Sequence, residues 1–593
     1  MGEKRSDFVG EIYQRKTDFI VIGITGWTGS GCTSVSNILT KDFEEWKLKP
    51  DSESESSSNE KLKYNIIYEY AKSNYKKFTL IRMKEVITLF LLLNSIEEFN
   101  KFIEPKCEGY PKHKYKLNEE TKILINSIKK ELEKEYNIKD MGMLDKIQNE
   151  ENKDLYTLYF EKLRKYTDDL ENYFNNPYMY KKIFREMADN IRSSGNPFKT
   201  EYIEGNIFKI SNVINNMIKV LRHHNEGGKT LVVIDGFRNP YDVTFFKDRY
   251  SAFYLFSVNS NNEDRRQRLI DSYLNIKEIS ELDKKDEKND TSSPECYIFC
   301  RQDIEKCIEL SDVYLYNPYD KHGISSRLKE QVIRYISLIM HPGLITPTHI
   351  ERCMQIAYNA KLNSGCLSRQ VGAVITDDNF VIKSIGWNDV PECQVSCNLR
   401  NIEDLDIKLH EEHFSDYELY DENFNKMVEY YNKHIKHIRN NESTDNANKI
   451  DGRFIPYCFK DIYNGIDKNK NQVHTRSLHA EENAFLQICK YGGMGLKNGY
   501  LFTTASPCEL CAKKSYQIGI REIYYIDLYP GISENHILKN GKNRPKLILF
   551  EGAIGRAYTQ MYSQILPLKD ELYMLLEMKF NKTLQQIESK EEK

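Results

Sequence analysis

Two short motifs in the C-terminal half of the 593-residue chain constrain its fold more than any other feature. One is His479-Ala-Glu481, and the other is Pro507-Cys508-Glu-Leu-Cys511. One imidazole and two thiolates are ligands that Zn²⁺ prefers, and a catalytic zinc site with three protein ligands keeps its fourth position open. The two-residue spacer between the cysteines lets both sulfurs converge on one ion. The sequence therefore predicts a domain built around Zn²⁺, with His479, Cys508 and Cys511 as its ligands.

Each motif lies where a helix is expected to begin. Cys508 follows a proline, which is favoured in the first helical turn, and the preceding apolar run 500–502 indicates a strand. A helix N-terminus stabilises a thiolate. Glu481 is expected one turn inside a second helix, too close to His479 in sequence to be another ligand. We predict that it is the catalytic acid and base, with a pKa raised by burial. Either motif alone is weak, because a lone Cys-x-x-Cys also occurs in redox sites and zinc knuckles.

Composition and charge exclude several classes of protein. The net charge is −3 and 29% of the residues are charged, which argues against a non-specific polyanion-binding protein. The 13 cysteines are too sparse for a disulfide scaffold and suit a reducing compartment. The N-terminus has no hydrophobic signal region, and no apolar run is long enough to span a bilayer. We therefore expect a cytoplasmic protein without membrane contact, with two large domains at this length.

A glycine-rich stretch near the N-terminus indicates a second site. The apolar run 19–24 predicts a strand, residues 35–43 have helical periodicity, and Gly26-Trp-Thr-Gly-Ser-Gly-Cys-Thr33 lies between them. Strand, turn and helix in this order form the context of a phosphate-binding P-loop. The candidate nucleotide-binding residues of this loop are Gly26, Gly29, Ser30, Gly31, Cys32, Thr33 and Ser34.

One position of this loop departs from the P-loop pattern. Cys32 replaces the lysine, so the side chain that neutralises phosphate charge during transfer is missing. Thr33 retains the hydroxyl that binds Mg²⁺, and Asp235 ends the apolar strand 230–234 as in a Walker B motif. We therefore predict a regulatory site for a nucleotide with Mg²⁺ that is not an efficient kinase. The alternative is a glycine-rich turn that binds no ligand.

The first half of the chain alternates between predicted strands and helices. Further apolar runs at 253–258 and 311–317 complete a pattern that predicts a parallel sheet with helices on both faces. Arginines within 263–268 resemble the lid of small-molecule P-loop kinases. Residues from about 100 to 200 are rich in Lys, Glu, Leu and Tyr with helical periodicity, which predicts a helical insertion. We assign residues 1–343 to a P-loop kinase-like α/β domain.

Proline and glycine within 341–347 mark the junction to a second domain. Thr348 and Glu351 fit a capping box at the start of the next helix. The segments 368–375 and 381–388 predict a β-hairpin, and the runs 523–526 and 546–550 predict later strands. The polar, tyrosine-rich interval from about 400 to 475 is interpreted as an insertion near the mouth of the site. Residues 344–593 are expected to form an α/β/α domain.

Four motifs together resemble the deoxycytidylate deaminase family, over roughly residues 346–560. They are Ser368-Arg369-Gln-Val-Gly-Ala-Val-Ile375, Gly386-Trp-Asn388-Asp-Val-Pro391, His479-Ala-Glu481 and Pro507-Cys508-Glu-Leu-Cys511. The last two match the H-x-E and P-C-x-x-C signature of zinc-dependent nucleobase deaminases. The resemblance implies a cytidine-deaminase-like fold, hydrolytic deamination of free dCTP or dCMP, and substrate contacts from Asn388 and Arg369.

The order of the two domains carries a further resemblance. A P-loop domain without its lysine, followed by such a deaminase, is similar to the bacterial anti-phage deoxycytidine nucleotide deaminases. This similarity implies depletion of dCTP and dCMP during phage infection and a homo-oligomeric enzyme. It also implies that activity is held down in uninfected cells, in some systems by a small RNA.

Other functions stay open at this point. A deaminase that edits a base in RNA or single-stranded DNA needs an electropositive groove with stacking aromatics, which a net-negative chain does not favour. A nucleotide-sensing scaffold with structural zinc needs no acid such as Glu481 and normally closes the metal site with a fourth protein ligand. Cys393, Cys397 and His474 are either ligands of a second zinc or ordinary side chains.

Overall fold

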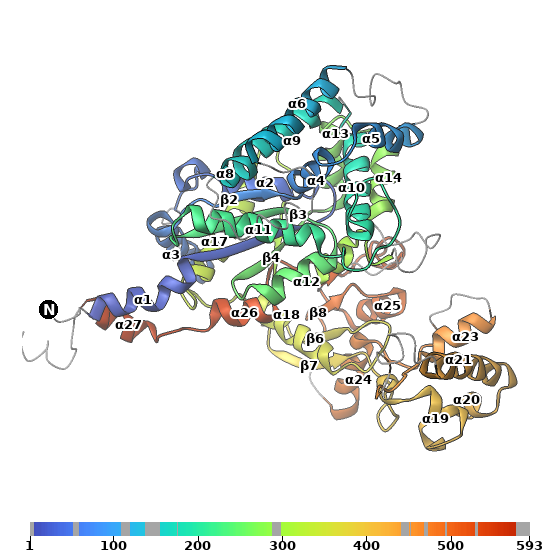
Figure 1. Ribbon diagram of the computed structural model, residues 1–593. Coiled ribbons are helices and arrows are strands. Elements are labelled where there is room, and N and C mark those ends of the chain that lie inside the picture. Colours follow the sequence, from blue (N-terminus) through green and yellow to red (C-terminus); the bar gives the residue numbers. More distant parts are fainter. Residues whose placement is uncertain are drawn as a thin grey trace, which may run out of the picture. The chain divides into compact units, whose positions relative to one another are not determined.

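The computed structural model divides the chain into two compact units (Figure 1). The first unit comprises Met1–Pro347 and Glu551–Lys593, and the second unit comprises Thr348–Phe550. The residues that the structure describes are 5–50, 58–107, 119–136, 154–174, 176–286, 298–440, 450, 452–467, 473–492, 495–527 and 532–576.

The first unit is built on a six-stranded sheet with the strand order β11-β5-β4-β1-β3-β2. Neighbouring strands are parallel except β11, which runs antiparallel to β5. The strands are β1 (Phe19–Thr25), β2 (Thr79–Arg82), β3 (Thr230–Phe237), β4 (Phe253–Asn259), β5 (Val313–Tyr316) and β11 (Gly552–Ala553). The expected parallel sheet is therefore confirmed.

Helices cover both faces of this sheet, because successive side chains of a strand point to opposite faces. In β1, Ile20, Ile22 and Ile24 belong to one buried core, whereas Val21 belongs to the other. The first core is shared with α2 (Cys32–Leu39), α3 (Asn59–Asn74) and α17 (Ser326–Met340). The second core is shared with α4 (Met83–Leu92), α10 (Pro177–Ser194), α11 (Lys209–His224) and α12 (Pro240–Arg249).

The interval between β2 and β3 is mostly helical where the structure describes it, apart from turns and the irregular stretch 195–208. Its helices join the core of α4, whose side chains Val86, Leu89 and Phe90 are completely buried. These helices include α5 (Ile96–Ile103), α6 (Glu119–Tyr136), α9 (Leu163–Phe174) and α10. Parts of the predicted insertion at 108–118, 137–153 and 175 lie outside the described residues. The two helices α13 (Asn262–Asp271) and α14 (Ile276–Asp286) follow β4.

The C-terminal segment differs from the expected domain boundary, because residues from 551 onward group with the first unit. β11 pairs with β5, and Ala557 and Met561 of α26 (Gly555–Tyr562) enter the core that contains α17. Glu571 of α27 (Leu568–Leu575) accepts a hydrogen bond from Tyr13 of α1 (Arg5–Thr17). A two-residue strand has no sequence pattern of its own, so the sequence did not reveal that the chain rejoins the first unit after residue 550.

The second unit contains a five-stranded mixed sheet with the order β10-β9-β8-β6-β7. β6 runs antiparallel to both β7 and β8, whereas β8, β9 and β10 are parallel. The strands are β6 (Gly372–Thr376), β7 (Ile382–Trp387), β8 (Tyr500–Ala505), β9 (Glu522–Asp527) and β10 (Lys546–Leu549). The helices α24 (Ala480–Tyr491) and α25 (Glu509–Ile518) share a core with this sheet, and α18 (His349–Ala360) packs against β6 and β8.

The described residues between 400 and 467 of the second unit form a small helical subdomain with its own core, which we call the insertion. Phe424 and Val428 are among its buried residues, and the Arg400 guanidinium at its base is completely buried against Glu418 and Tyr457. Its helices are α19 (Ile402–Asp406), α20 (Asp416–Tyr420), α21 (Glu422–Asn440) and α23 (Phe459–Asp467).

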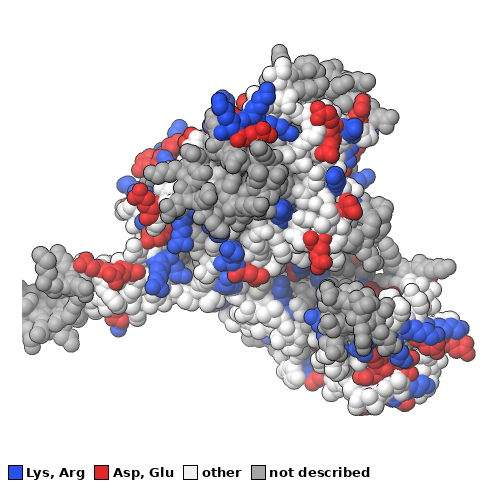
Figure 2. Space-filling view, in the orientation of Figure 1, with Lys and Arg blue, Asp and Glu red and all other residues white. Residues whose placement is uncertain are grey.

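Acidic and basic side chains are interspersed on the face of the molecule drawn in Figure 2. Among the residues that the structure describes, none of the helices combines the length and apolar character needed to cross a bilayer.

Candidate active site

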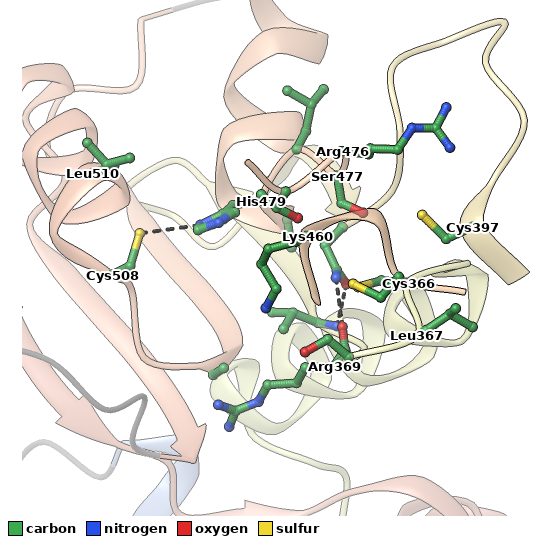
Figure 3. A pocket seen from close by; sticks show the side chains of 18 of the residues that line it. Cys366, Leu367, Arg369, Cys397, Lys460, Arg476, Ser477, His479, Cys508 and Leu510 are labelled. Atoms are coloured by element: carbon green, nitrogen blue, oxygen red, sulfur yellow. Dashed lines mark hydrogen bonds between the residues drawn. The ribbon is translucent and has the colours of Figure 1, made fainter. Parts of the chain in front are cut away.

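Two helix N-termini bring the predicted metal ligands together. His479 is the residue immediately before α24, and Cys508 immediately precedes α25, so both lie where backbone N–H groups are exposed. The Nδ1 atom of His479 is 3.3 Å from the Cys508 sulfur and 3.5 Å from the Cys511 sulfur. All three ligand atoms lie within 4.8 Å of one another. Figure 3 shows the His479 ring facing the Cys508 sulfur across the pocket.

Of these three side chains, Cys508 carries the negative charge that favours a cation. A hydrogen bond from Cys511, with a further contribution from His479, lowers the pKa of Cys508 to about 4 despite its burial. The same contact with Cys508, together with burial, raises the pKa of Cys511. The hydrogen bond with Cys508 raises the pKa of His479. One imidazole and two sulfurs at this spacing fit a single Zn²⁺, whose ligands are nitrogen and thiolate sulfur.

Glu481 lies in the first turn of α24 and is almost completely buried, with 4% of its surface exposed. Burial raises the pKa of its carboxyl group. The Thr503 hydroxyl of β8 lies 3.4 Å from Glu481 Oε1 and donates a 2.8 Å hydrogen bond to the Ala505 carbonyl. Glu481 is outside the group of three potential ligands, so its carboxyl group is available for proton transfer.

A cavity of about 590 Å³ opens onto these residues. Its walls come from the segment before β6, from the ends of α23, α24 and α25, and from residues 473–478. Three basic residues, Arg369, Lys460 and Arg476, line it. In Figure 3 the Lys460 ammonium group and the Arg369 guanidinium point into the same part of the view, whereas the Arg476 guanidinium extends away from it. Lys460 belongs to the insertion, so the insertion forms part of the pocket wall.

Residues 347–527 match the family model of the cytidine and deoxycytidylate deaminase zinc-binding region. This region is a deaminase-type domain. The deoxycytidylate deaminase of Enterobacteria phage T2 is 26% identical over 209 residues, which are 33% of this chain and 91% of that relative. ComE operon protein 2 of Bacillus subtilis (strain 168) is 31% identical over 98 residues, or 14% of this chain and 51% of that protein.

A solved structure is also similar. The crystal structure of dCMP deaminase from the cyanophage S-TIM5 in complex with dCMP and dUMP has a TM-score of 0.20 and 20% sequence identity, and the match covers 35% of this chain and 99% of that one.

The two predicted substrate contacts of the deaminase domain both line the pocket, and both also contact protein groups. The side-chain oxygen of Asn388 accepts a 2.6 Å hydrogen bond from the Val371 N–H, and its amide nitrogen donates a 2.7 Å bond to the Arg369 carbonyl. Asn388 thereby holds the segment 369–371 at the pocket wall. The Arg369 guanidinium forms an ion pair with Asp527 at the end of β9.

Cys393, Cys397 and His474 do not converge on one point in the part of the deaminase domain that the structure describes. Cys393 is exposed, Cys397 is buried at the pocket wall, and the His474 ring is tilted against the Tyr463 ring with their centroids 4.4 Å apart. The described residues contain only one further group with metal-ligand spacing, an exposed turn with His410, Glu412 and His413.

Sequence reasoning missed Lys460 as a pocket residue and Thr503 as a neighbour of Glu481. Thr503 lies inside a strand that was predicted, and its register toward Glu481 depends on how β8 pairs with β6. Lys460 is one of many lysines in the chain, and no motif surrounds it.

The glycine-rich loop of the first unit lies between β1 and α2, as predicted. Gly29 and Gly31 have φ values of 86° and 104°, in the left-handed region that favours glycine. The Thr33 hydroxyl donates a 3.2 Å hydrogen bond to Asp235 at the end of β3, so the structure brings these two residues together. Burial, and secondarily Asp235, raises the pKa of the Cys32 thiol to about 12, so this thiol stays neutral.

Proposed function

We propose that the protein catalyses the zinc-dependent hydrolytic deamination of free deoxycytidine nucleotides, dCMP or dCTP, to deoxyuridine nucleotides. The observation that carries this proposal is the buried Glu481 beside His479, Cys508 and Cys511, at a cavity within a deaminase-type domain. A structural zinc site has no use for such an acid, and the scaffold alternative is therefore less well supported.

His479, Cys508 and Cys511 would hold the metal, and Glu481 would move the protons. When bound, Zn²⁺ supplies a Lewis acid that makes water a stronger nucleophile at neutral pH. The Glu481 carboxylate accepts a proton from the attacking water and delivers it to ring nitrogen N3 as oxygen adds to C4. Glu481 then takes the remaining proton from the C4 hydroxyl and transfers it to the amino group, so that the C4 carbonyl forms, the C4–N bond breaks and ammonia leaves. A pKa raised by burial suits a carboxyl group that both accepts and donates.

The cations of the pocket support a phosphorylated substrate. The Lys460 side chain is 12% exposed, lines the same cavity as Glu481, and lies 3.6 Å from the carboxylate of the exposed Asp461. An ammonium group at that depth attracts a phosphate more strongly than one on the surface. An editor of polynucleotides would need a longer basic track, and the face drawn in Figure 2 shows acidic residues interspersed among the basic ones. A single nucleotide therefore fits the pocket best.

A substrate panel tests this proposal. We expect the purified protein to convert dCMP or dCTP to the uracil nucleotide, as followed by mass spectrometry. Cytosine in single-stranded DNA and RNA oligonucleotides should stay unchanged. Deamination of the oligonucleotides without deamination of either free nucleotide would overturn the assignment and favour an editing enzyme.

We further propose that the first unit controls this activity through a nucleotide with Mg²⁺ at the glycine-rich loop. The supporting observations are the loop conformation and the contact between Thr33 and Asp235. In the biological role we propose, a cytoplasmic homo-oligomer depletes dCTP and dCMP in defence against phage, with restraint by a small RNA. That role is supported by the similarity of the domain order to anti-phage deaminases. Equal dCTP and dCMP pools in infected cells with wild-type protein and with Glu481→Ala would contradict it.

A further inference from the structure

The glycine-rich loop presents backbone N–H groups that lack an acceptor. Alternation of left-handed and right-handed residues builds concave nests of N–H groups that bind anions. Four N–H groups of this loop, those of Gly29, Gly31, Cys32 and Thr33, donate to no other residue among those that the structure describes, and the Cys32 N–H lies against its own thiol. Cys32 and Thr33 also begin α2, whose N-terminus adds a partial positive charge. The loop backbone is therefore built to receive an anion.

Two guanidinium groups lie beside this loop and share a single carboxylate. Arg185 of α10 and Arg238, which follows β3, both donate hydrogen bonds to the Thr28 hydroxyl. Both also pair with Asp286, at 3.0 Å and 3.1 Å. Asp286 in turn accepts hydrogen bonds from the Thr28 hydroxyl and N–H. Asp189 and Asp283 add negative charge near Arg185 without pairing with it, so Asp286 is the one ion-pair partner of the two guanidinium groups among the described residues.

Lys181 adds a third cation to this group. It lies one helical turn before Arg185 in α10, so the two side chains share a face of the helix. No carboxylate among the described residues lies within ion-pair distance of Lys181. Glu171 is the acid whose charge acts on Lys181, and Glu171 itself pairs with Lys84. Burial, and then the charges of Arg185 and Arg238, lowers the pKa of Lys181 to about 8. A half-buried ammonium group among cations is unfavourable until an anion approaches it.

We propose that the loop together with Lys181, Arg185 and Arg238 binds the phosphate chain of a di- or triphosphate, and that Lys181 supplies the cation that position 32 lacks. This inference rests on the proposed role of the loop and is independent of the deamination reaction. The lysine of a standard P-loop lies at the start of the helix, whereas here the charge would come from a helix that is distant in sequence. A polyphosphate chain, with its several negative charges, matches both the four N–H groups and the three cations.

Isothermal titration of the full-length protein with inorganic tripolyphosphate and Mg²⁺ tests this site without involving deamination. Lys181→Met should weaken binding by about tenfold to a hundredfold, which is the range for one hydrogen bond to a charged group. Lys182→Met is the matched control, because Lys182 is the next residue of the same helix and lies over the Tyr178 ring instead. Its affinity should stay within about twofold of wild type, since that ring contact is peripheral to the anion. Lys181→Arg should retain most of the affinity.

The melting temperature without ligand separates a binding role from a structural one. If the role of Lys181 is to bind an anion, Lys181→Met removes an uncompensated charge and leaves the melting temperature of the free protein unchanged or higher. A lower melting temperature with unchanged tripolyphosphate affinity would show that Lys181 only supports the fold. Equal affinity of Lys181→Met and wild type, or no binding of tripolyphosphate by the wild type, would each overturn the proposal. Deamination of dCMP by the same samples reports separately on the second unit.

Discussion

The two candidate sites use the same backbone feature and fill it with opposite charges. In both units a strand leads into the N-terminus of a helix, β8 into α25 and β1 into α2. At α25 the side chains are two thiols with an imidazole and a buried carboxyl nearby. At α2 they are a neutral thiol and a hydroxyl, with guanidinium and ammonium groups around them. Both sites use the exposed N–H groups of a helix N-terminus, and the surrounding side chains determine which ligand each site binds.

This contrast shows how an incomplete site can be recognised. Around His479 the sulfur of Cys508 carries negative charge that a metal cation would neutralise, since the pKa of this thiol is about 4. Around Thr28 two guanidinium groups share Asp286 as their ion-pair partner, and Lys181 pairs with no carboxylate among the described residues. Each group is favourable only with a ligand of the opposite sign. The first site also holds Glu481, which is outside the group of metal ligands and available for proton transfer, whereas the carboxyl group of the second site, Asp235, accepts a hydrogen bond from Thr33.

The largest expected effect tests the reactive side of this comparison. Glu481→Gln should lower kcat for dCMP or dCTP by about a hundredfold to ten-thousandfold, the range for loss of a general acid and base. The bound zinc, measured by elemental analysis, should stay at the wild-type level because Glu481 lies outside the ligand group.

Glu482→Gln is the control for this variant, since Glu482 is the neighbouring residue and pairs with Lys514. It should keep near-normal turnover. Near-normal turnover of Glu481→Gln, or loss of its zinc, would show that the carboxyl group has a different role.

The next effect tests the binding side. Gly31→Ala should reduce tripolyphosphate affinity by about a hundredfold, because several N–H contacts to a charged ligand are displaced together. A β-carbon at Gly31 would lie 2.0 Å from the Asn317 amide nitrogen, and its φ of 104° disfavours alanine. Zinc content and deaminase chemistry should be retained.

Gly205→Ala is matched to this variant in backbone strain. Gly205 has a φ of 89°, but nothing lies within 4 Å of a β-carbon built there. If both variants bind tripolyphosphate equally well, the loop is not the anion site.

Sequence reasoning succeeded where residues close in the chain determine the geometry. The spacing of Cys508 and Cys511, and the position of Glu481 after His479, place these side chains at two helix starts, as the structure has them. Most strands of both sheets followed from apolar runs, and β2 and β11 are the exceptions. Residues whose importance depends on distant partners were not recognisable, and Lys181 and Lys460 are the two examples. Neither lysine belongs to a sequence motif, and each becomes important only because the fold places it near other functional residues.

Lys460 offers a test of whether the first site also has an anion-binding part. Lys460→Met should raise the KM for dCMP by about tenfold, the loss expected for one charged hydrogen bond, with little change in turnover of unphosphorylated deoxycytidine. Lys433→Met is the control within the same insertion, because that side chain is 80% exposed. An equal loss for dCMP and deoxycytidine would mean that Lys460 shapes the pocket without contacting the phosphate.

The smallest effect is a pH dependence that belongs to the second site alone. The groups that act on Lys181 are Arg185 of the same helix, Arg238 after β3, and Lys84 and Glu171 of α4 and α9. With a pKa of about 8 in the free protein, Lys181 loses its proton as the pH rises through that value, whereas a bound anion favours the protonated form and raises the pKa. Binding therefore takes up a proton, and affinity falls as the pH increases. Between about pH 7 and about pH 8.5 the wild type should lose about fourfold more affinity for tripolyphosphate than Lys181→Met, a comparison that removes the titration of the probe itself. Parallel pH profiles for the two proteins would assign the charge at the loop to Arg185 and Arg238 and leave Lys181 without a part in binding.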